Sequence, residues 1–408
     1  MRRVAIVGAT VLVAVATAAA PAGAITACPG VDPSVTPVLT GEGSLESVIV
    51  DARGRLYYTD TTAQALKRLD APGAHPEVVA AGIASPGGLA IDDQGRILLG
   101  QGNSAAGGAL GNLAPSARLL RIDPETGEVT TVASGLQMTN GVVRAADGAV
   151  YASNDIGLGI DRIGADGSVA LRWARVTSPN GLAIDRAQRY LYAAQTFQPA
   201  AIARIDLEDP SAVETYATPA ADGIAGGPDG MAIDGRDRLV VAANAGGEVW
   251  RVDTDRTICS VGRGLTTPSA VAYGHSDRGF SAGRLFSVGF DGVVAEIPGG
   301  RVLGADLAPV PADAAAPTGT TQGPGVFRVL FAPVRARVRG GTVRLSPKVT
   351  LVRPDGERVR LVRRVRLGAA RTRTGRPTRL RVRAGQRSIT ARFTVRGLVR
   401  TRRVTLVR

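Results

Sequence analysis

The sequence is poor in several residue types that many sites and anchors require. Its 408 residues include two cysteines, Cys28 and Cys259, only two histidines, and two lysines, Lys67 and Lys348. Beyond residue 24 no run approaches the ~20 apolar residues that a membrane-spanning helix needs, which excludes such a helix there. Because lysine is so rare, nearly all basic residues are arginine, which in an alanine-, glycine- and valine-rich chain reflects GC-rich coding better than a functional choice.

The first 24 residues have the features of a secretory signal peptide. Arg2 and Arg3 precede an apolar stretch, and residues 22–24 read Ala-Gly-Ala, the small-x-small pattern of a signal peptidase site. We therefore expect that residues 1–24 are removed and that the protein is secreted or associated with the cell surface.

The two cysteines leave three alternatives open. An exported pair suggests a disulfide between Cys28 and Cys259. Residues 25–28, Ile-Thr-Ala-Cys, also resemble a lipobox, in which Cys28 becomes the lipidated first residue of a bacterial lipoprotein. In the third alternative both thiols remain unpaired.

Charge is divided unevenly along the chain. The net charge is +14, but residues 326–408 carry 25 arginines and lysines against Asp355 and Glu357, a net charge of +23. Residues 1–325 therefore have a net charge of −9. The length predicts two domains or one large repeat architecture, and the opposite charges of the two parts favour a division near residue 325.

A short motif recurs six times in the acidic part. Its copies begin LESVIV, PGGLAI, TNGVV, PNGLAI, PDGMAI and PSAVAY. The second residues of the copies are equivalent, and they are Glu46, Gly87, Asn140, Asn180, Asp229 and Ser269. They are 41, 53, 40, 49 and 40 residues apart, close to the ~40–50 residues of a β-propeller blade.

Each copy predicts the same unit of structure. A turn leads into a short apolar strand, a polar turn such as D-x-x-G follows, and a second strand precedes two more, for example AIARID and VETYAT. Four strands make one blade, so we predict an all-β, six-bladed β-propeller over residues 25–300. The sixth copy supplies three clear strands, and TPVLTG at residues 36–41 supplies the fourth, which closes the ring and removes its exposed edges.

The C-terminal part has a different pattern. Residues 301–325 are rich in Ala, Pro, Gly and Thr and are expected to form a linker. Residues 326–408 alternate apolar residues with arginine, which predicts half-buried strands and a small, basic, β-sandwich-like domain. Its arginines could bind an anionic cell envelope, bind extracellular nucleic acid, which is the least favoured alternative, or merely solvate the outer face of a sheet.

The equivalent residues of the six copies also predict a metal site. In a propeller the innermost strand of each blade lines the central channel, so these residues converge on one axis. Glu46, Asn140, Asn180 and Asp229 would supply oxygen ligands, which hard cations such as Ca²⁺ prefer. Asn-Gly and Asp-Gly are also ordinary turn formers, but glutamate has little turn preference and occupies the same position. We therefore predict a divalent cation at the channel mouth, with calcium favoured.

The ends of the second strands should return to the same face. Polar residues there are expected either to contact substrate or to be ordinary turn residues. These residues are Asp60, Asn103, Asn154, Asp155, Gln195 and Asn244.

Residues 226–253, GGPDGMAIDGRDRLVVAANAGGEVWRVD, resemble a segment of the SMP-30/gluconolactonase/LRE-like proteins, six-bladed lactonases with a more distant likeness to paraoxonases. The resemblance covers roughly residues 33–300. It implies that Asp229 is both a metal ligand and the general base, and that Asn180 and Glu46 are further ligands. By the same likeness Asn140 contacts the metal or the substrate.

The sequence also departs from that family. Ser47 and Val48 stand where the family usually has Gly-Pro, and Met138 stands where an arginine often lies two residues before the third-blade asparagine. These departures argue against a sugar-acid lactone as the substrate. Neither His75 nor His275 belongs to the repeated positions, so a paraoxonase-type histidine base is unsupported, and we expect both in surface loops.

Two functions follow from these observations. The favoured one is an exported, metal-dependent hydrolase that opens a small-molecule lactone or related ester, with Asp229 as the base. The alternative is a non-catalytic propeller, similar to NHL-like or strictosidine-synthase-like proteins, that binds a ligand or protein around a structural metal. A propeller fold does not decide between them.

Overall fold

The computed structural model describes residues 25–197, 200–219 and 227–307, and further along the chain the strands between residues 328 and 407. The predicted signal peptide and residues 308–325 of the predicted linker lie outside the described residues. Two compact units are present, residues 1–316 and 317–408. None of the helices in the described segments is long and apolar enough to cross a membrane.

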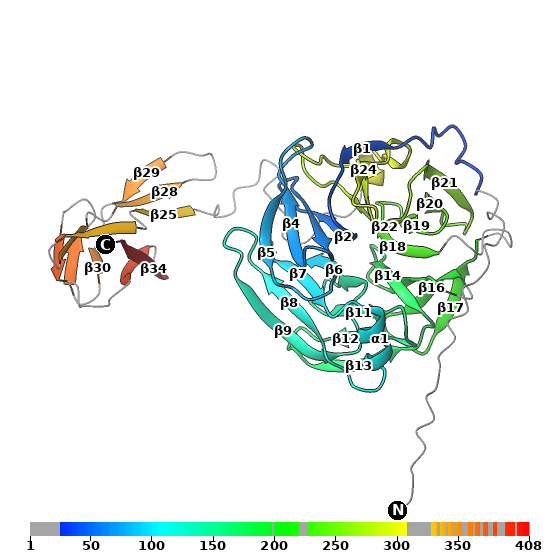
Figure 1. Ribbon diagram of the computed structural model, residues 1–408, viewed down its shortest axis with the longest axis horizontal. Coiled ribbons are helices and arrows are strands. Elements are labelled where there is room, and N and C mark those ends of the chain that lie inside the picture. Colours follow the sequence, from blue (N-terminus) through cyan, green and yellow to red (C-terminus); the bar gives the residue numbers. More distant parts are fainter. Residues whose placement is uncertain are drawn as a thin grey trace, which may run out of the picture. The chain divides into compact units, whose positions relative to one another are not determined.

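The first unit is a six-bladed β-propeller, as predicted, and each blade is a four-stranded antiparallel sheet (Figure 1). The strands of blades one to three are β2 (Leu45–Val50), β3 (Leu56–Asp60), β4 (Ala65–Leu69) and β5 (Glu77–Ala81); β6 (Pro86–Ile91), β7 (Ile97–Gln101), β8 (Ala117–Ile122) and β9 (Val129–Leu136); and β10 (Val142–Arg144), β11 (Val150–Asn154), β12 (Gly159–Ile163) and β13 (Val169–Ala174).

The other three blades have the same order of strands. They are β14 (Pro179–Ile184), β15 (Tyr190–Gln195), β16 (Ala201–Asp206) and β17 (Val213–Ala217); β18 (Pro228–Ile233), β19 (Leu239–Ala243), β20 (Glu248–Val252) and β21 (Ile258–Arg263); and β22 (Pro268–Tyr273), β23 (Leu285–Gly289), β24 (Val294–Glu296) and β1 (Thr36–Leu39). A short helix, α1 (Ala105–Gly111), connects β7 to β8, and two 3₁₀ turns, Pro298–Gly300 and Gly304–Asp306, follow β24.

The first strand of every blade lies nearest the central axis and contacts the first strands of both neighbouring blades. These six strands line the channel. The N-terminal strand β1 pairs antiparallel with β24 and completes blade six, which confirms the predicted closure. A disulfide joins Cys28, just before β1, to Cys259 on β21 in blade five, which corresponds to the first of the three alternatives for these cysteines. The N-terminal segment therefore closes the ring through both strand pairing and a covalent bond.

Apolar side chains fill the space between neighbouring blades. Tyr57, Trp250 and Phe286 are among the largest side chains that are fully buried there. Each such side chain contributes about 1.5–3 kcal/mol to folding when it is buried rather than exposed. The packing makes the blades a rigid support for the residues that line the channel.

The repeated D-x-x-G segments form the turns between the first and second strands. Asp51 accepts hydrogen bonds from the backbone N–H groups of Arg53 and Arg55 and from Arg55 Nε. Asp92 and Asp234 make the same three types of bond in blades two and five. This part of the motif is therefore structural, and it lies at the end of the blades opposite to the entry of the first strands.

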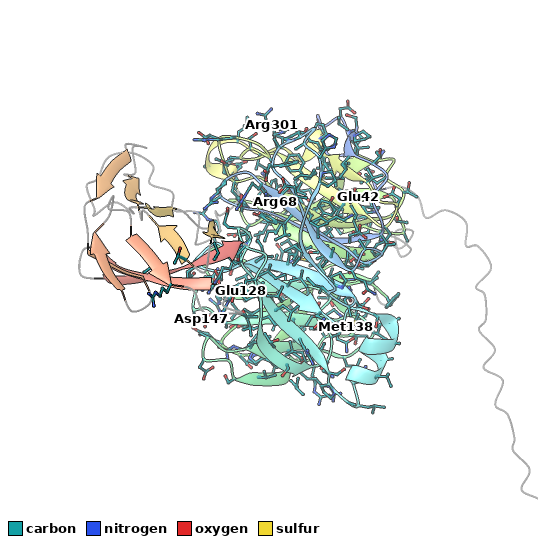
Figure 2. All side chains as sticks on the ribbon, turned by 60° about the vertical axis from the view of Figure 1, so that its left-hand side comes forward. Glu42, Arg68, Glu128, Met138, Asp147 and Arg301 are labelled. Carbon is teal, nitrogen blue, oxygen red and sulfur yellow. A yellow bond between two sulfur atoms is a disulfide. The ribbon has the colours of Figure 1, made fainter. Side chains whose placement is uncertain are left out.

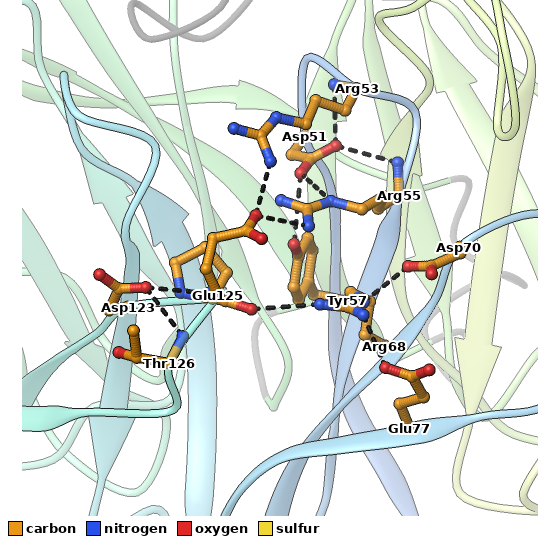
Figure 3. A network of polar contacts seen from close by, with 11 residues as sticks. Asp51, Arg53, Arg55, Tyr57, Arg68, Asp70, Glu77, Asp123, Glu125 and Thr126 are labelled. Atoms are coloured by element: carbon orange, nitrogen blue, oxygen red, sulfur yellow. Dashed lines mark hydrogen bonds and ion pairs between the residues drawn. The ribbon is translucent and has the colours of Figure 1, made fainter. Parts of the chain in front are cut away.

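In blade one this turn belongs to a larger polar network (Figure 3). Arg53 and Arg55 both bind the carboxylate of Glu125, in the turn between β8 and β9 of blade two. Arg68 donates a hydrogen bond to the backbone oxygen of Pro124 in the same turn. Because the exposed fractions of Arg53 and Glu125 are both 55%, solvent screens their pair, which contributes at most about 1 kcal/mol. The network holds neighbouring blades in register.

Residues 301–307, which the sequence analysis included in the linker, contact the propeller. Asp306 forms ion pairs with Arg236 and Arg238, in the turn between β18 and β19. The backbone N–H of Gly235 also donates to the Asp306 carbonyl. The chain thus follows blade five as far as the last described residue before the C-terminal unit.

The second unit consists of ten described strands. β25, β28 and β29 form one sheet, and the other seven form a second sheet in the order β31-β30-β33-β34-β26-β27-β32. The strands are β25 (Arg328–Ala332), β26 (Arg335–Arg339), β27 (Thr342–Leu345), β28 (Lys348–Val352), β29 (Arg358–Leu361), β30 (Arg364–Leu367), β31 (Ala370–Arg373), β32 (Thr378–Arg381), β33 (Ser388–Val395) and β34 (Leu398–Val407). The sandwich-like packing of this domain stays a prediction.

Candidate functional site

The six equivalent residues lie where the innermost strands begin. In five of the six blades the strand register shifts there: Pro179 pairs with Gln195, for example, whereas Leu182 pairs with Ala193, so two residues of β14 face one residue of β15. The same type of irregularity occurs in β2, β6, β18 and β22. A β-bulge of this kind changes the direction of a side chain at the rim of a sheet. This local feature carries Glu46, Asn180 and Asp229, whereas Asn140 lies just before β10, which has no such shift.

In blades four and five the Asn-Gly and Asp-Gly pairs are not turns, which corrects the sequence-based interpretation, whereas Asn140 and Gly141 form a bend before β10. Asn180 and Gly181 lie in β14, and Asp229 and Gly230 lie in β18. A Cβ at Gly181 would lie 2.3 Å from the carbonyl oxygen of Asp229. The glycine is required because the first strands of adjacent blades approach too closely for a side chain, and this tertiary contact overrides the turn preference of the dipeptide.

Hydroxyl groups of the second strands and of the following connections hold the bulges in place. Ser153 Oγ donates to the carbonyl oxygen of Asn180 at 2.6 Å, and Thr196 Oγ1 donates to that of Pro228 at 2.8 Å. Asn180 Nδ2 in turn donates to Thr196 Oγ1 at 2.9 Å. These bonds connect consecutive blades and orient the amide of Asn180. Sequence reasoning missed Ser153 and Thr196 because nothing in the repeat marks them.

Glu46, Asn140, Asn180 and Asp229 converge in the structure at one end of the channel. They line a common small cavity, and Asn140 Nδ2 donates to Glu46 Oε1 at 3.3 Å. The side chains of Asn140, Asn180 and Asp229 are buried. The four residues singled out by the repeat are thus neighbours in space.

The carboxylates of this site have unusual pKa values. Burial raises the pKa of Asp229 well above its ordinary range, and the negative charges of Glu46 and Asp155 raise it further, although a hydrogen bond from Asn180 acts in the opposite direction. Burial also raises the pKa of Glu46 to about 7 and that of Asp155 to about 6. The site therefore concentrates negative charge in a desolvated place.

These residues fit a hard divalent cation. Within the described segments, no arginine or lysine forms an ion pair with Glu46, Asp155 or Asp229. The Oδ1 atoms of Asn103 and Asp155 are buried and have no hydrogen-bond partner. Uncompensated buried carboxylates are costly, and carboxylate and amide oxygens are the ligands that Ca²⁺ prefers. The described residues contain no group of three or more His, Cys, Asp and Glu side chains suited to a metal, and two of the four candidate ligands are amides.

A wider cavity of about 300 Å³ opens outward from the ring. Of the residues that the sequence analysis expected at the mouth, Asn103, Asp155 and Asn244 line this cavity together with Glu46 and Asp229. Asn244 Nδ2 donates to the carbonyl oxygen of Pro268 at 3.1 Å. The cavity could admit a small molecule as far as the acidic ring.

Asp60, Asn154 and Gln195, also expected at the mouth, do not line the cavity, and their polar atoms have partners elsewhere. Asp60 forms an ion pair with Lys67 at 2.8 Å. Asn154 Nδ2 donates to the Gly108 carbonyl, and Gln195 Nε2 donates to that of Thr177. The three side chains lie near the ends of second strands and have structural roles there.

A second cavity, of about 440 Å³, lies at the opposite end of the channel and is lined by none of the candidate ligands. His275 lies in the loop between β22 and β23, as expected, but its side chain is half-buried and lines this cavity. Its Nδ1 is buried without a hydrogen-bond partner, and burial lowers its pKa to about 4. By contrast, His75 is exposed in the loop between β4 and β5, as expected.

Comparisons with known proteins agree with this fold. The family model described as the SMP-30/Gluconolactonase/LRE-like region matches residues 44–279. A gluconolactonase from Xanthomonas campestris is similar in structure, with a TM-score of 0.53 and 20% identity over 68% of this chain and 98% of its own. A luciferin-regenerating enzyme is similar with a TM-score of 0.54 and 15% identity, over 69% of this chain and 99% of its own. None of the curated proteins compared with the chain matches it significantly. Because the family model spans more than half of the sequence, the chain belongs to the SMP-30/gluconolactonase/LRE-like family.

Proposed function

We propose that this protein is a metal-dependent hydrolase that opens a lactone or a related ester at the mouth of its central channel. The observation that carries the proposal is the convergence of Glu46, Asn140, Asn180 and Asp229 in one cavity, with carboxylates that lack a basic partner. Membership of a family that includes lactonases supports the same reaction class.

The residues of the site would divide the chemistry among them. Glu46, Asn180 and Asp229, with Asn140, would hold a divalent cation, and calcium is the ion we favour. Such a cation, when bound, polarises an ester carbonyl and acidifies a neighbouring water. Asp229 would accept a proton from the attacking water through the carboxylate oxygen that does not bind the ion. General-base catalysis of this type contributes on the order of 10²–10⁴-fold.

The reaction balances with water as the only co-reactant. The water oxygen forms the new bond to the carbonyl carbon, and the ring C–O bond breaks. Asp229 can return its proton to the departing alkoxide oxygen, so that a lactone and water yield a hydroxy acid. The burial of Asp229 supports its role as a base, because a desolvated carboxylate binds a proton more strongly than an exposed one.

The deciding experiment is hydrolysis of a lactone panel by the purified chain. The panel contains aldonolactones and acyl lactones, assayed first with Ca²⁺ and then with excess chelator. We expect turnover that the chelator abolishes and that returns when Ca²⁺ is added back. A folded protein that Ca²⁺ stabilises against heat but that hydrolyses none of the esters would favour a non-catalytic binding propeller instead.

Export and attachment to the cell envelope complete the proposal. The signal-peptide pattern and the disulfide between Cys28 and Cys259 support an extracytoplasmic location, and the charge of +23 on residues 326–408 supports binding to an anionic envelope. In a bacterial host, we expect the protein in the envelope fraction and its release by about 0.5–1 M salt, because salt screens exposed charges. Release by nuclease, with no effect of salt on envelope binding, would contradict this part of the proposal.

A further inference from the structure

Exposed apolar side chains gather at the end of the propeller that carries the candidate site. Six large ones lie in connections between second and third strands: Leu110, Leu113, Ile156, Leu158, Phe197 and Phe290. Exposed valines also begin three fourth strands at the opposite end, Val129, Val169 and Val213, and Leu303 and Leu307 follow the last blade. The mouth differs because both phenylalanines among the exposed large apolar side chains of the described residues lie there.

The topology explains why these side chains share one end with the acidic ring. The first strand of each blade begins at the ring, so the antiparallel second strand ends there, and its connection to the third strand surrounds the mouth. Figure 2 shows Met138 and Glu42 toward one edge of the propeller and Glu128 and Asp147 toward the other. Phe197, with 53% of its surface exposed, has water rather than protein over much of its ring.

Four apolar side chains form part of the wall of the cavity itself. They are Met138, Ile156, Phe197 and Phe290. Met138 is buried beneath α1, where a Cβ at Gly108 would lie 2.5 Å from Met138 Sδ and 3.2 Å from the Cβ of Ile156. The helix thus fixes Met138 and Ile156 next to the acidic ring, while Phe197 and Phe290 extend the wall outward.

Several polar groups of the cavity already have hydrogen-bond partners within the protein. The Thr196 hydroxyl donates to Pro228 and accepts from Asn180, and Asn244 donates to Pro268. Ser104 Oγ accepts from the backbone N–H of Gly107. Hydroxyl groups that lie against the apolar side chains would lose their hydrogen bonds to water without replacement, and each such loss costs affinity.

We propose that the substrate is a lactone or ester with an apolar alkyl or aryl substituent, which lies against Met138, Ile156, Phe197 and Phe290 while its carbonyl faces the acidic ring. This inference rests on the proposed function, and it specifies the substrate class of that site. Burial of one methylene contributes about 0.8 kcal/mol, which corresponds to a roughly fourfold change in affinity.

The test is a series of δ-lactones with alkyl substituents of increasing length, together with an aldonolactone. We expect kcat/KM to increase about two- to fourfold for each methylene that reaches the wall, and the aldonolactone to be the poorest substrate. In the Phe197→Ala variant the slope of this increase should be clearly smaller. Val129→Ala, which removes an exposed apolar side chain at the start of β9 near the opposite end, should leave the whole series unchanged.

A second measurement separates this inference from the proposed reaction. Binding of δ-lactams with the same substituents, measured by calorimetry, requires no hydrolysis. Affinity that increases with chain length in the wild type and less steeply in Phe197→Ala supports the apolar site even when no lactone is turned over. Chain-length independence in both series, or a preference for the aldonolactone, overturns the inference whether or not the protein is a lactonase.

Discussion

The charged carboxylate of Asp229 is unfavourable for folding, although the proposed reaction requires it. Its carboxylate is buried with Glu46 and Asp155 nearby, so desolvation and repulsion both oppose its charged form. A residue placed only for stability would be apolar or paired with a base. The unfavourable environment is understandable when a cation shares the site, because the attraction of the ion offsets both costs.

The Asp229→Asn variant separates these effects, because asparagine keeps the shape of the side chain and removes its charge. We expect lactone hydrolysis to fall about 10²–10⁴-fold, while the metal-free protein becomes more stable as the charge repulsion is relieved. Thermal unfolding with and without Ca²⁺ should show a smaller stabilisation by the ion than in the wild type. Asp166→Asn, an exposed carboxylate in the turn before β13, is the matched control. Equal stabilisation of both variants by Ca²⁺ would argue against Asp229 as a ligand.

His275 makes the stability of the fold depend on pH. Its pKa is about 4 in the folded protein and near 6.5 in the unfolded chain, so between these values the unfolded chain binds the proton more readily. The free energy of unfolding should therefore decrease as the pH falls from about 6.5 to about 4, by an amount on the order of 1–3 kcal/mol.

Denaturant unfolding of the wild type and His275→Gln at pH 7 and pH 4.5 tests this expectation. The variant lacks the titrating group, so the stability difference between the two proteins should change with pH in favour of the variant at pH 4.5. Other carboxylates titrate in both proteins and cancel in the comparison. A difference that stays constant with pH would show that burial does not shift His275.

At the level of elements, the bulged start of the innermost strand is the unit that builds the site. One extra residue in the strand turns a candidate ligand toward the axis, and the next residue is a glycine in β14 and β18 because the adjacent blade leaves no room for a Cβ. The same close approach brings the carbonyl groups of neighbouring blades within reach of Ser153 and Thr196. Ligand geometry and packing between blades are therefore coupled.

The Gly181→Ala variant tests this coupling. Its Cβ would meet the carbonyl oxygen of Asp229, so the strands must separate, and we expect a loss of about 2–4 kcal/mol in stability together with at least tenfold lower activity. Gly167→Ala is the control, because no atom lies within 4 Å of the new Cβ. Its only expected cost is the positive φ at this position, about 1–2 kcal/mol in stability. Similar losses of activity in both variants would mean that the close approach does not position the site.

For the whole molecule, closure of the ring determines whether the four candidate ligands can meet. The ends of the propeller are joined by β1 in blade six and by the disulfide between Cys28 and Cys259. The disulfide connects residues that are 231 positions apart, so it restricts the unfolded chain over nearly the entire propeller. The pairing of β1 with β24 and the disulfide therefore both fix the N-terminal segment to the last blades of the ring.

A variant with both Cys28→Ser and Cys259→Ser should unfold more easily than the wild type. We expect a loss of about 2–5 kcal/mol in the free energy of unfolding, and little change in kcat/KM at temperatures where the variant is folded. Chemical denaturation and lactone assays on the same preparation provide both quantities. Unchanged stability would indicate that β1 alone closes the ring.

The sequence predicted much of the fold because its information is periodic. Six copies about 40–50 residues apart, each with four strands, are compatible with few architectures, and the missing strand of blade six could be found by counting. The positions of Glu46, Asn140, Asn180 and Asp229 followed from the same alignment of copies, since equivalent residues of a propeller share one axis. Cys28 and Cys259, as the sole pair, left one intrachain bridge to consider.

What the repeat could not reveal depends on contacts between blades. The dipeptides Asn180-Gly181 and Asp229-Gly230 have the local preference of turns, and only the approach of the next blade makes them bulged strands. Likewise, the apolar wall around the acidic ring consists of Met138, Ile156, Phe197 and Phe290, which lie in connections of three blades far apart in the sequence. The burial that shifts the pKa of His275 is set in the same way, by side chains distant in sequence. Local patterns specify strands and their repetition, whereas the environment of a side chain depends on which blades pack around it.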